Sequence, residues 1–134
     1  MIDPKLVTPY EQLGGEERVR DIARRFYDAM ETHEPALAAV HRVTAEGKIH
    51  PDARENFALF FIGWLGGPQT YVERHGHPRL RMRHAKVPVT SAMRDAWMRA
   101  MGRALDECEV RGEIRAFLEQ RLGEVADFLR NTPG

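Results

Sequence analysis

Apolar residues recur every three or four positions in four long segments of this chain, and this spacing constrains the fold more than any other feature. The clearest segment starts at Glu16 and carries these apolar positions on one face: Val19, Ile22, Ala23, Phe26, Tyr27 and Met30. The other three begin near Pro51, near Thr90 or Ser91, and after Gly112. No segment shows the sustained alternation of apolar and polar residues that is typical of a strand. The sequence therefore predicts an all-α fold of four long helices packed against one another.

Prolines and glycines mark the expected helix boundaries. Thr8, followed by Pro9 and Glu11, has the pattern of a helix cap, and the short helix that it opens should end at Gly14. Residues 69–88 are interrupted by Gly76, Pro78 and Pro88 and should form short helical pieces at most.

Size and charge exclude several classes of protein. The 134 residues suit one domain, over 1–134, in which residues 1–8 are expected to form a loose N-terminal extension. Twenty basic residues are balanced by twenty acidic residues, which argues against a nucleic-acid-binding surface. The 43% of hydrophobic residues is too high for a disordered chain.

Cysteine content and hydropathy give expectations about compartment and chemistry. Cys108 is the single cysteine, so no internal disulfide or thiolate zinc site can form. The apolar stretch from Phe57 to Leu65 is too short to span a membrane. No signal peptide is visible, and we therefore expect a cytoplasmic protein with no membrane partner.

One of the six histidines has unusual neighbours. His84 follows Arg79, Arg81 and Arg83, between two prolines. A single imidazole ligand beside several guanidinium groups suits a heme, because iron binds imidazole and the propionates pair with arginine. An exposed basic loop is the alternative interpretation of this segment.

Two aromatic residues on the predicted helical faces carry polar groups. A buried Tyr27 phenol and a buried Trp97 indole each need a hydrogen-bond partner. Two donors that face inward would suit a pocket for a diatomic ligand that carries negative charge, although a simple aromatic core is the alternative. No Cys-x-x-Cys-His motif is present, so a heme would be held without covalent attachment.

Three stretches of the sequence together resemble the group II (O-type) truncated hemoglobins of the globin superfamily. They are Leu65-Gly66-Gly67-Pro68, the tract from His75 to His84, and Asp95-Ala96-Trp97. The resemblance implies a truncated globin fold, a two-over-two helical sandwich around a non-covalent heme b with its iron.

The resemblance also implies roles for individual residues. His84 corresponds to the proximal ligand of the heme iron. The distal, ligand-binding positions correspond to Tyr27, His41, Ala53, Phe57 and Trp97. The segment between Tyr27 and His41 is one residue longer than in the relatives compared, which leaves a register one residue away open for His41. Further contacts with the cofactor are expected from Arg79, Arg81, Arg83, Tyr71, Met82, Phe61 and His77.

We therefore expect a protein that reversibly binds dioxygen, and also carbon monoxide, nitric oxide or peroxide, at an iron with a polar distal pocket. One alternative is a heme enzyme with peroxidase-like or nitric oxide detoxifying activity, fed by a separate reductase. A more remote alternative is a heme-free helical interaction module. The chain is expected to be a monomer or a homodimer.

Overall fold

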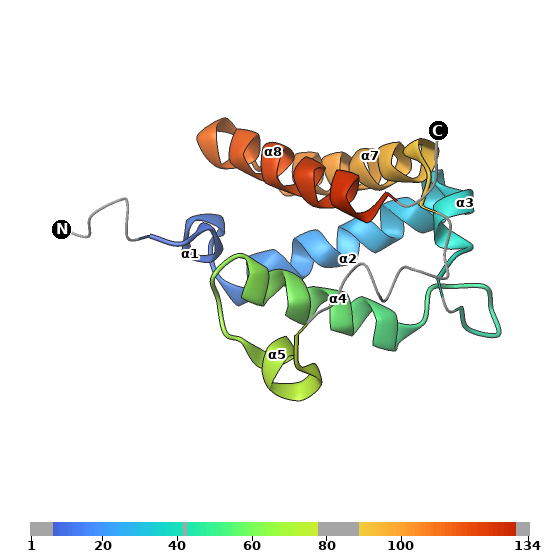
Figure 1. The fold of residues 1–134 in the computed structure, drawn as a ribbon, viewed down its shortest axis with the longest axis horizontal. Coiled ribbons are helices and arrows are strands. Elements are labelled where there is room, and N and C mark those ends of the chain that lie inside the picture. Colours follow the sequence, from blue (N-terminus) through green and yellow to red (C-terminus); the bar gives the residue numbers. More distant parts are fainter. Residues whose placement is uncertain (1–6, 42, 78–88, 131–134) are drawn as a thin grey trace.

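The regular structure is helical throughout the part of the chain that the computed structural model describes, residues 7–41, 43–77 and 89–130 (Figure 1). The one exception within these ranges is an isolated bridge between Val43 and Ile49. The helices are α1 (Pro9–Leu13), α2 (Glu16–His33), α3 (Pro35–Ala38), α4 (Pro51–Trp64), α5 (Thr70–His75), α7 (Ser91–Glu107) and α8 (Gly112–Leu129). The predicted all-α class is confirmed, and each of the four long amphipathic segments forms a helix.

Side chains at three helix N-termini explain where the helices begin. The hydroxyls of Thr8 and Thr90 each accept the backbone N–H three residues on, at 3.1 Å, and so cap α1 and α7. Thr90, and not Ser91, is therefore the cap of α7. The α4 cap was not predicted: Nδ1 of His50 accepts the backbone N–H of the second residue after it at 3.1 Å. Thr8, expected in the loose extension, is thus tied to α1.

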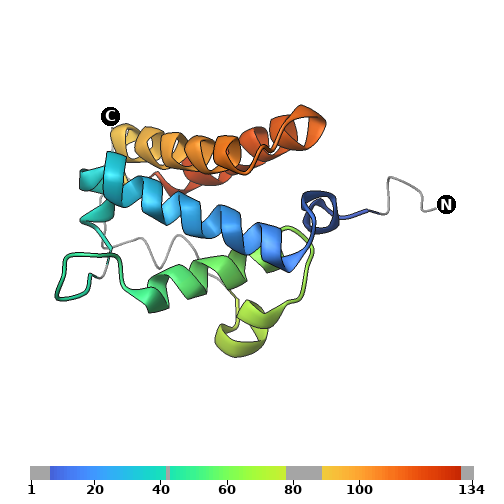
Figure 2. The same ribbon diagram turned by 180° about the vertical axis from the view of Figure 1, so that it is seen from behind.

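The long helices form two layers. In Figure 1, α7 and α8 lie side by side above α2, and α4 lies beneath it; Figure 2 shows the same order from behind. Helix α2 packs most extensively against α7 on one side and α4 on the other. This arrangement of the α2/α4 pair against the α7/α8 pair confirms the predicted two-over-two helical sandwich.

The core follows the apolar face of α2. Val19, Ile22, Phe26 and Met30 have no exposed surface, and each buried side chain of this size contributes about 1.5–3 kcal/mol to stability. Across from α2, the α7 residues of the core include two fully buried alanines, Ala100 and Ala104. These small side chains allow α2 and α7 to pack closely, which is why the most extensive helix contact is between them.

The Gly66-Gly67 pair lies where α1 meets the end of α4. The N–H of Tyr10 donates a hydrogen bond to the carbonyl of Leu65 at 3.0 Å. Gly66 has a φ of +96°, which favours glycine. A Cβ on Gly67 would lie 2.6 Å from the ring of Tyr10. The two glycines are therefore required by the close approach of α1.

The described residues also bear on the predicted lack of a membrane span and on the state of the single cysteine. None of the described helices has the length and apolar composition needed to cross a lipid bilayer. Cys108, at the end of α7, is 4% exposed, and its Sγ lies 3.6 Å from a carboxylate oxygen of Asp21. Burial raises the pKa of the thiol, with the Asp21 charge acting in the same direction, so Cys108 is a poor nucleophile.

We expect Gly67→Ala to lower the free energy of unfolding by about 1–3 kcal/mol, because the rigid Tyr10 ring must move to admit the methyl group. The matched control is Gly102→Ala in the interior of α7. There the nearest atom to the added Cβ is 3.9 Å away, and alanine should raise stability by about 0.5–1 kcal/mol through helix propensity. Chemical denaturation of both variants measures the difference. A Gly67→Ala protein as stable as wild type would contradict this account of the junction.

Candidate functional site

Aromatic side chains from α2, α4 and α7 meet around Phe26, which is fully buried on α2. The ring centroid of Phe26 lies 5.0 Å from that of Trp97 on α7 and 5.2 Å from that of Phe57 on α4. Tyr27, the next residue on α2, lies 5.5 Å from Phe57 and 5.6 Å from the ring of His41, which follows α3. Four of the five predicted distal residues therefore share one cluster.

Tyr27 is a protonated hydrogen-bond donor in this cluster. The side chain is 5% exposed, and burial raises the pKa of its phenol well above the usual value near 10. Among the described residues its hydroxyl has no hydrogen-bond partner. Every fully buried polar side-chain atom of the described residues has a hydrogen-bond partner. Because the Tyr27 hydroxyl has none, it is not fully buried and borders open space.

Trp97 is the second donor. It is half-buried, and within the described residues its indole N–H likewise has no hydrogen-bond partner. Tyr27 and Trp97 come from different helices and both contact Phe26. An aromatic wall that presents two donors to open space fits a flat apolar cofactor whose bound ligand needs hydrogen bonds.

His41 has its hydrogen-bonding role fixed by α3. Its Nδ1 lies 3.0 Å from the carbonyl oxygen of Leu37. A carbonyl only accepts, so Nδ1 carries the hydrogen, and Nε2 of the neutral ring has none to donate. At Nε2 the neutral imidazole can therefore only accept a hydrogen bond, and the predicted distal role of His41 stays a prediction.

Helix α4 contributes the predicted positions Ala53 and Phe57, which lie one turn apart on the same face. Both are partly buried and pack against the core. Phe61, another turn on, is 1% exposed and stacks between the rings of Phe57 and Trp64, at 5.5 and 6.1 Å. Protein therefore covers Phe61, and its expected contact with the cofactor stays a prediction.

The remaining predicted residues divide into two groups. Tyr71 of α5 is 7% exposed and packs between Phe60 and His75, with ring centroids 5.8 and 4.9 Å away, while His77 is exposed just beyond α5. The proximal ligand and four cofactor contacts lie outside the described residues and stay predictions: His84, Arg79, Arg81, Met82 and Arg83.

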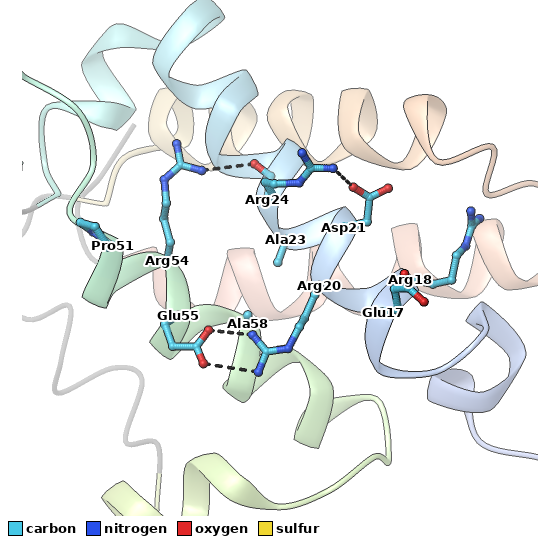
Figure 3. Close-up of a pocket in the computed structure, with 10 residues that line it drawn as sticks. All are labelled: Glu17, Arg18, Arg20, Asp21, Ala23, Arg24, Pro51, Arg54, Glu55 and Ala58. Atoms are coloured by element: carbon cyan, nitrogen blue, oxygen red, sulfur yellow. Dashed lines mark hydrogen bonds and ion pairs between the residues drawn. The ribbon is translucent and has the colours of Figure 1, made fainter.

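A groove of about 710 Å³ lies elsewhere, between α2 and α4 (Figure 3). Seven of its ten lining residues are charged, and ion pairs such as Arg20–Glu55 and Arg24–Asp21 cross it or line it. It contains no histidine, cysteine, tyrosine or methionine that could bind iron. Nor do the described residues contain a group of three metal-binding side chains. The aromatic cluster is therefore the better candidate site.

Two residues at this cluster were not predicted from the sequence to belong to the site. Phe26 was assigned to the core, yet its ring touches those of Tyr27, Phe57 and Trp97 and holds them together. Arg54 was not singled out, although its guanidinium lies over the Tyr27 ring, 5.6 Å from the centroid. The available signal was the position of Arg54, directly after Ala53 on the predicted distal helix.

The raised pKa of Tyr27 predicts an alkaline loss of stability. In the unfolded chain the phenol ionises near pH ~10, whereas the folded protein keeps it protonated to higher pH. Above about pH 10 the unfolded state therefore binds fewer protons, and the free energy of unfolding falls as pH rises. Between about pH 9 and about pH 11.5, the free energy of unfolding of Tyr27→Phe, measured by urea denaturation, should fall less than that of wild type. Equal losses in the two proteins would show that another group is responsible.

Comparison with known proteins identifies relatives over nearly the whole chain. The family model described as "Bacterial-like globin" matches residues 8–131. Group 2 truncated hemoglobin YjbI of Bacillus subtilis is 37% identical over 123 residues, which are 92% of this chain and 88% of the relative. Two-on-two hemoglobin-3 of Arabidopsis thaliana is 43% identical over a shorter stretch, 42% of this chain and 32% of the relative.

Solved structures agree in fold. The group II truncated hemoglobin from Bacillus anthracis superposes with a TM-score of 0.85 at 34% identity, covering 95% of this chain and 98% of that one. The group II 2-on-2 hemoglobin from Agrobacterium tumefaciens gives 0.86 at 33% identity, covering 99% and 100%. A Bacillus subtilis structure described as a truncated oxygen-avid haemoglobin gives 0.82 at 35% identity, covering 92% and 99%. By family model, sequence identity and fold, this chain belongs to the bacterial-like globins and is a group II truncated hemoglobin.

Proposed function

We propose that this globin binds dioxygen and other diatomic ligands reversibly, at a non-covalent heme b whose distal wall is formed by Tyr27, Phe57 and Trp97. The observation that carries the proposal is the pair of donors, Tyr27 and Trp97, that flank Phe26 and face open space. The oxygen-avid relative from Bacillus subtilis, 35% identical in sequence, supports the same ligand class.

Residues on the other side of the heme complete the proposed site. His84 would bind the iron, and the guanidinium groups of Arg79, Arg81 and Arg83 would pair with the propionates. When bound, the heme supplies the iron atom to which a diatomic ligand attaches.

The distal residues then decide how long the ligand stays. The Tyr27 hydroxyl and the Trp97 indole N–H donate hydrogen bonds, and each contributes about 1.5–3 kcal/mol when the ligand carries charge. Neutral His41 adds no donor, because its one N–H is directed to the Leu37 carbonyl. Phe57 closes the wall next to Tyr27, while the small Ala53 leaves room one turn away. Two donors slow ligand release, which suits capture of the ligand better than bulk transport.

The first prediction concerns the heme itself. The purified wild-type protein, loaded with heme, should show a Soret band, and His84→Ala should lose the imidazole-ligated spectrum in the ferric, ferrous and carbon monoxide forms. His33→Ala, which removes an exposed histidine at the end of α2, is the control and should leave the spectrum unchanged. Absence of a Soret band from the properly loaded wild-type protein would instead favour a heme-free interaction module.

The second prediction concerns the two donors. Trp97→Phe and Tyr27→Phe should each speed dioxygen release by about tenfold to a hundredfold, since each removes one hydrogen bond to a charged ligand. Trp64→Phe is the matched control, because Trp64 stacks on the far side of Phe61 and should not affect release. Stopped-flow displacement of dioxygen by carbon monoxide measures the rates. If release from Trp97→Phe and Tyr27→Phe matched wild type, the proposed distal pocket would be wrong.

A further inference from the structure

Charged side chains hold Arg54 of α4 against the outer side of Tyr27. One terminal nitrogen of Arg54 lies 3.0 Å from the Asp28 carboxylate, and the other lies 3.0 Å from the Glu31 carboxylate. The first nitrogen also donates to the carbonyl of Arg24 at 3.4 Å (Figure 3). Figure 3 shows Arg54 at one end of the groove, with its side chain extending from α4 to α2.

The three acceptors surround Tyr27 on the surface of α2. Arg24 lies three residues before Tyr27, Asp28 directly after it, and Glu31 four residues on, so the helix fixes all three relative to the tyrosine. Glu31 is itself held in place, since it is 13% exposed and accepts the N–H of Ile49 at 2.6 Å. The guanidinium therefore cannot leave its position without losing two ion pairs and the hydrogen bond to the Arg24 carbonyl.

The position of the guanidinium affects the phenol. Its central carbon lies over the Tyr27 ring at 5.6 Å from the centroid, within the range of cation–π attraction. A positive charge there favours negative charge on the phenol oxygen, and it lowers the pKa of Tyr27 against the larger effect of burial. An O–H that is polarised in this way is a stronger hydrogen-bond donor.

We infer that Arg54 is a positioning residue of the distal pocket: held by Asp28, Glu31 and the Arg24 carbonyl, it fixes the Tyr27 ring and strengthens its hydroxyl as a donor to the heme ligand. The inference rests on the proposed function, because it assigns Arg54 a role in the same pocket. The ion pairs of Arg54 with Asp28 and Glu31 would then do more than join α4 to α2.

An arginine that only joins α2 to α4 should affect neither the Tyr27 phenol nor ligand release. Arg20 joins the same two helices through Glu55, with nitrogen–oxygen distances of 2.7 and 3.3 Å, and no aromatic ring lies under its guanidinium among the described residues. Arg20→Met is therefore the matched control for Arg54→Met. Both variants remove one inter-helix arginine, and only the second removes a charge from the face of Tyr27.

The first readout is the Tyr27 phenol carbon, followed by NMR in ferrous, carbon monoxide-bound protein with ¹³C-labelled tyrosine. The chain has three tyrosines, so Tyr27→Phe assigns the signal. Arg54→Met should move the Tyr27 signal upfield, toward a less polarised phenol, and Arg20→Met should leave it in place. Arg54→Lys keeps the charge but cannot bind Asp28 and Glu31 with a planar fork, so it should give a smaller shift in the same direction.

The second readout is dioxygen release, which Arg54→Met should speed by about threefold to tenfold, while Arg20→Met stays at the wild-type rate. If Arg54→Met fails to fold, Arg54→Lys replaces it in both measurements, the Tyr27 signal and dioxygen release. A Tyr27 signal that does not move overturns the inference, as does unchanged release where Tyr27→Phe does speed it. If Tyr27→Phe itself leaves release unchanged, the proposed function fails, and the Tyr27 signal alone decides whether Arg54 polarises the phenol.

Discussion

The packing of α2 against two other helices at once is the constraint on which the rest of this structure depends. Phe26 has no exposed surface, and its ring contacts Trp97 of α7 at 5.0 Å and Phe57 of α4 at 5.2 Å. Because side chains in a core pack densely, moving any of these three helices would open a cavity or force a clash. The same contacts bring Tyr27 and Trp97 to one wall. The core and the distal pocket are therefore built from one set of aromatic contacts.

The chain has equal numbers of acidic and basic residues, and many of the described ones form ion pairs. Arginines join neighbouring helices at several exposed points, as in Arg25–Glu107 at 3.1 Å between α2 and α7 and in Arg94–Asp127 between α7 and α8. Exposed pairs of this kind contribute little to stability individually, typically up to about 1 kcal/mol. Arg54 differs because an aromatic ring, that of Tyr27, lies beneath its guanidinium. Position, and not the number of charges, separates a helix-joining arginine from one that acts on the pocket.

Much of the fold could be predicted because its signals are local. The period of the apolar residues, the Thr8 and Thr90 caps and the glycine after α1 each depend on residues within one or two turns. The tautomer of His41 could not be predicted in this way, because the hydrogen bond from Nδ1 to the Leu37 carbonyl exists only once α3 has formed its particular geometry. The role of Gly67 was equally hidden, since it depends on the ring of Tyr10, far away in the chain.

The sequence by itself determined the helical class, the four long amphipathic segments and the family, because periodicity, caps and the Leu65–Pro68 and Asp95–Trp97 motifs are written in consecutive residues. It also singled out Tyr27 and Trp97, since a phenol and an indole on apolar faces need partners. Only the tertiary structure decided that Phe26 joins those two donors, that His41 directs its N–H away from them, and that Arg54 lies over Tyr27. These features are contacts between separate helices, and their geometry is set by packing that no local pattern contains.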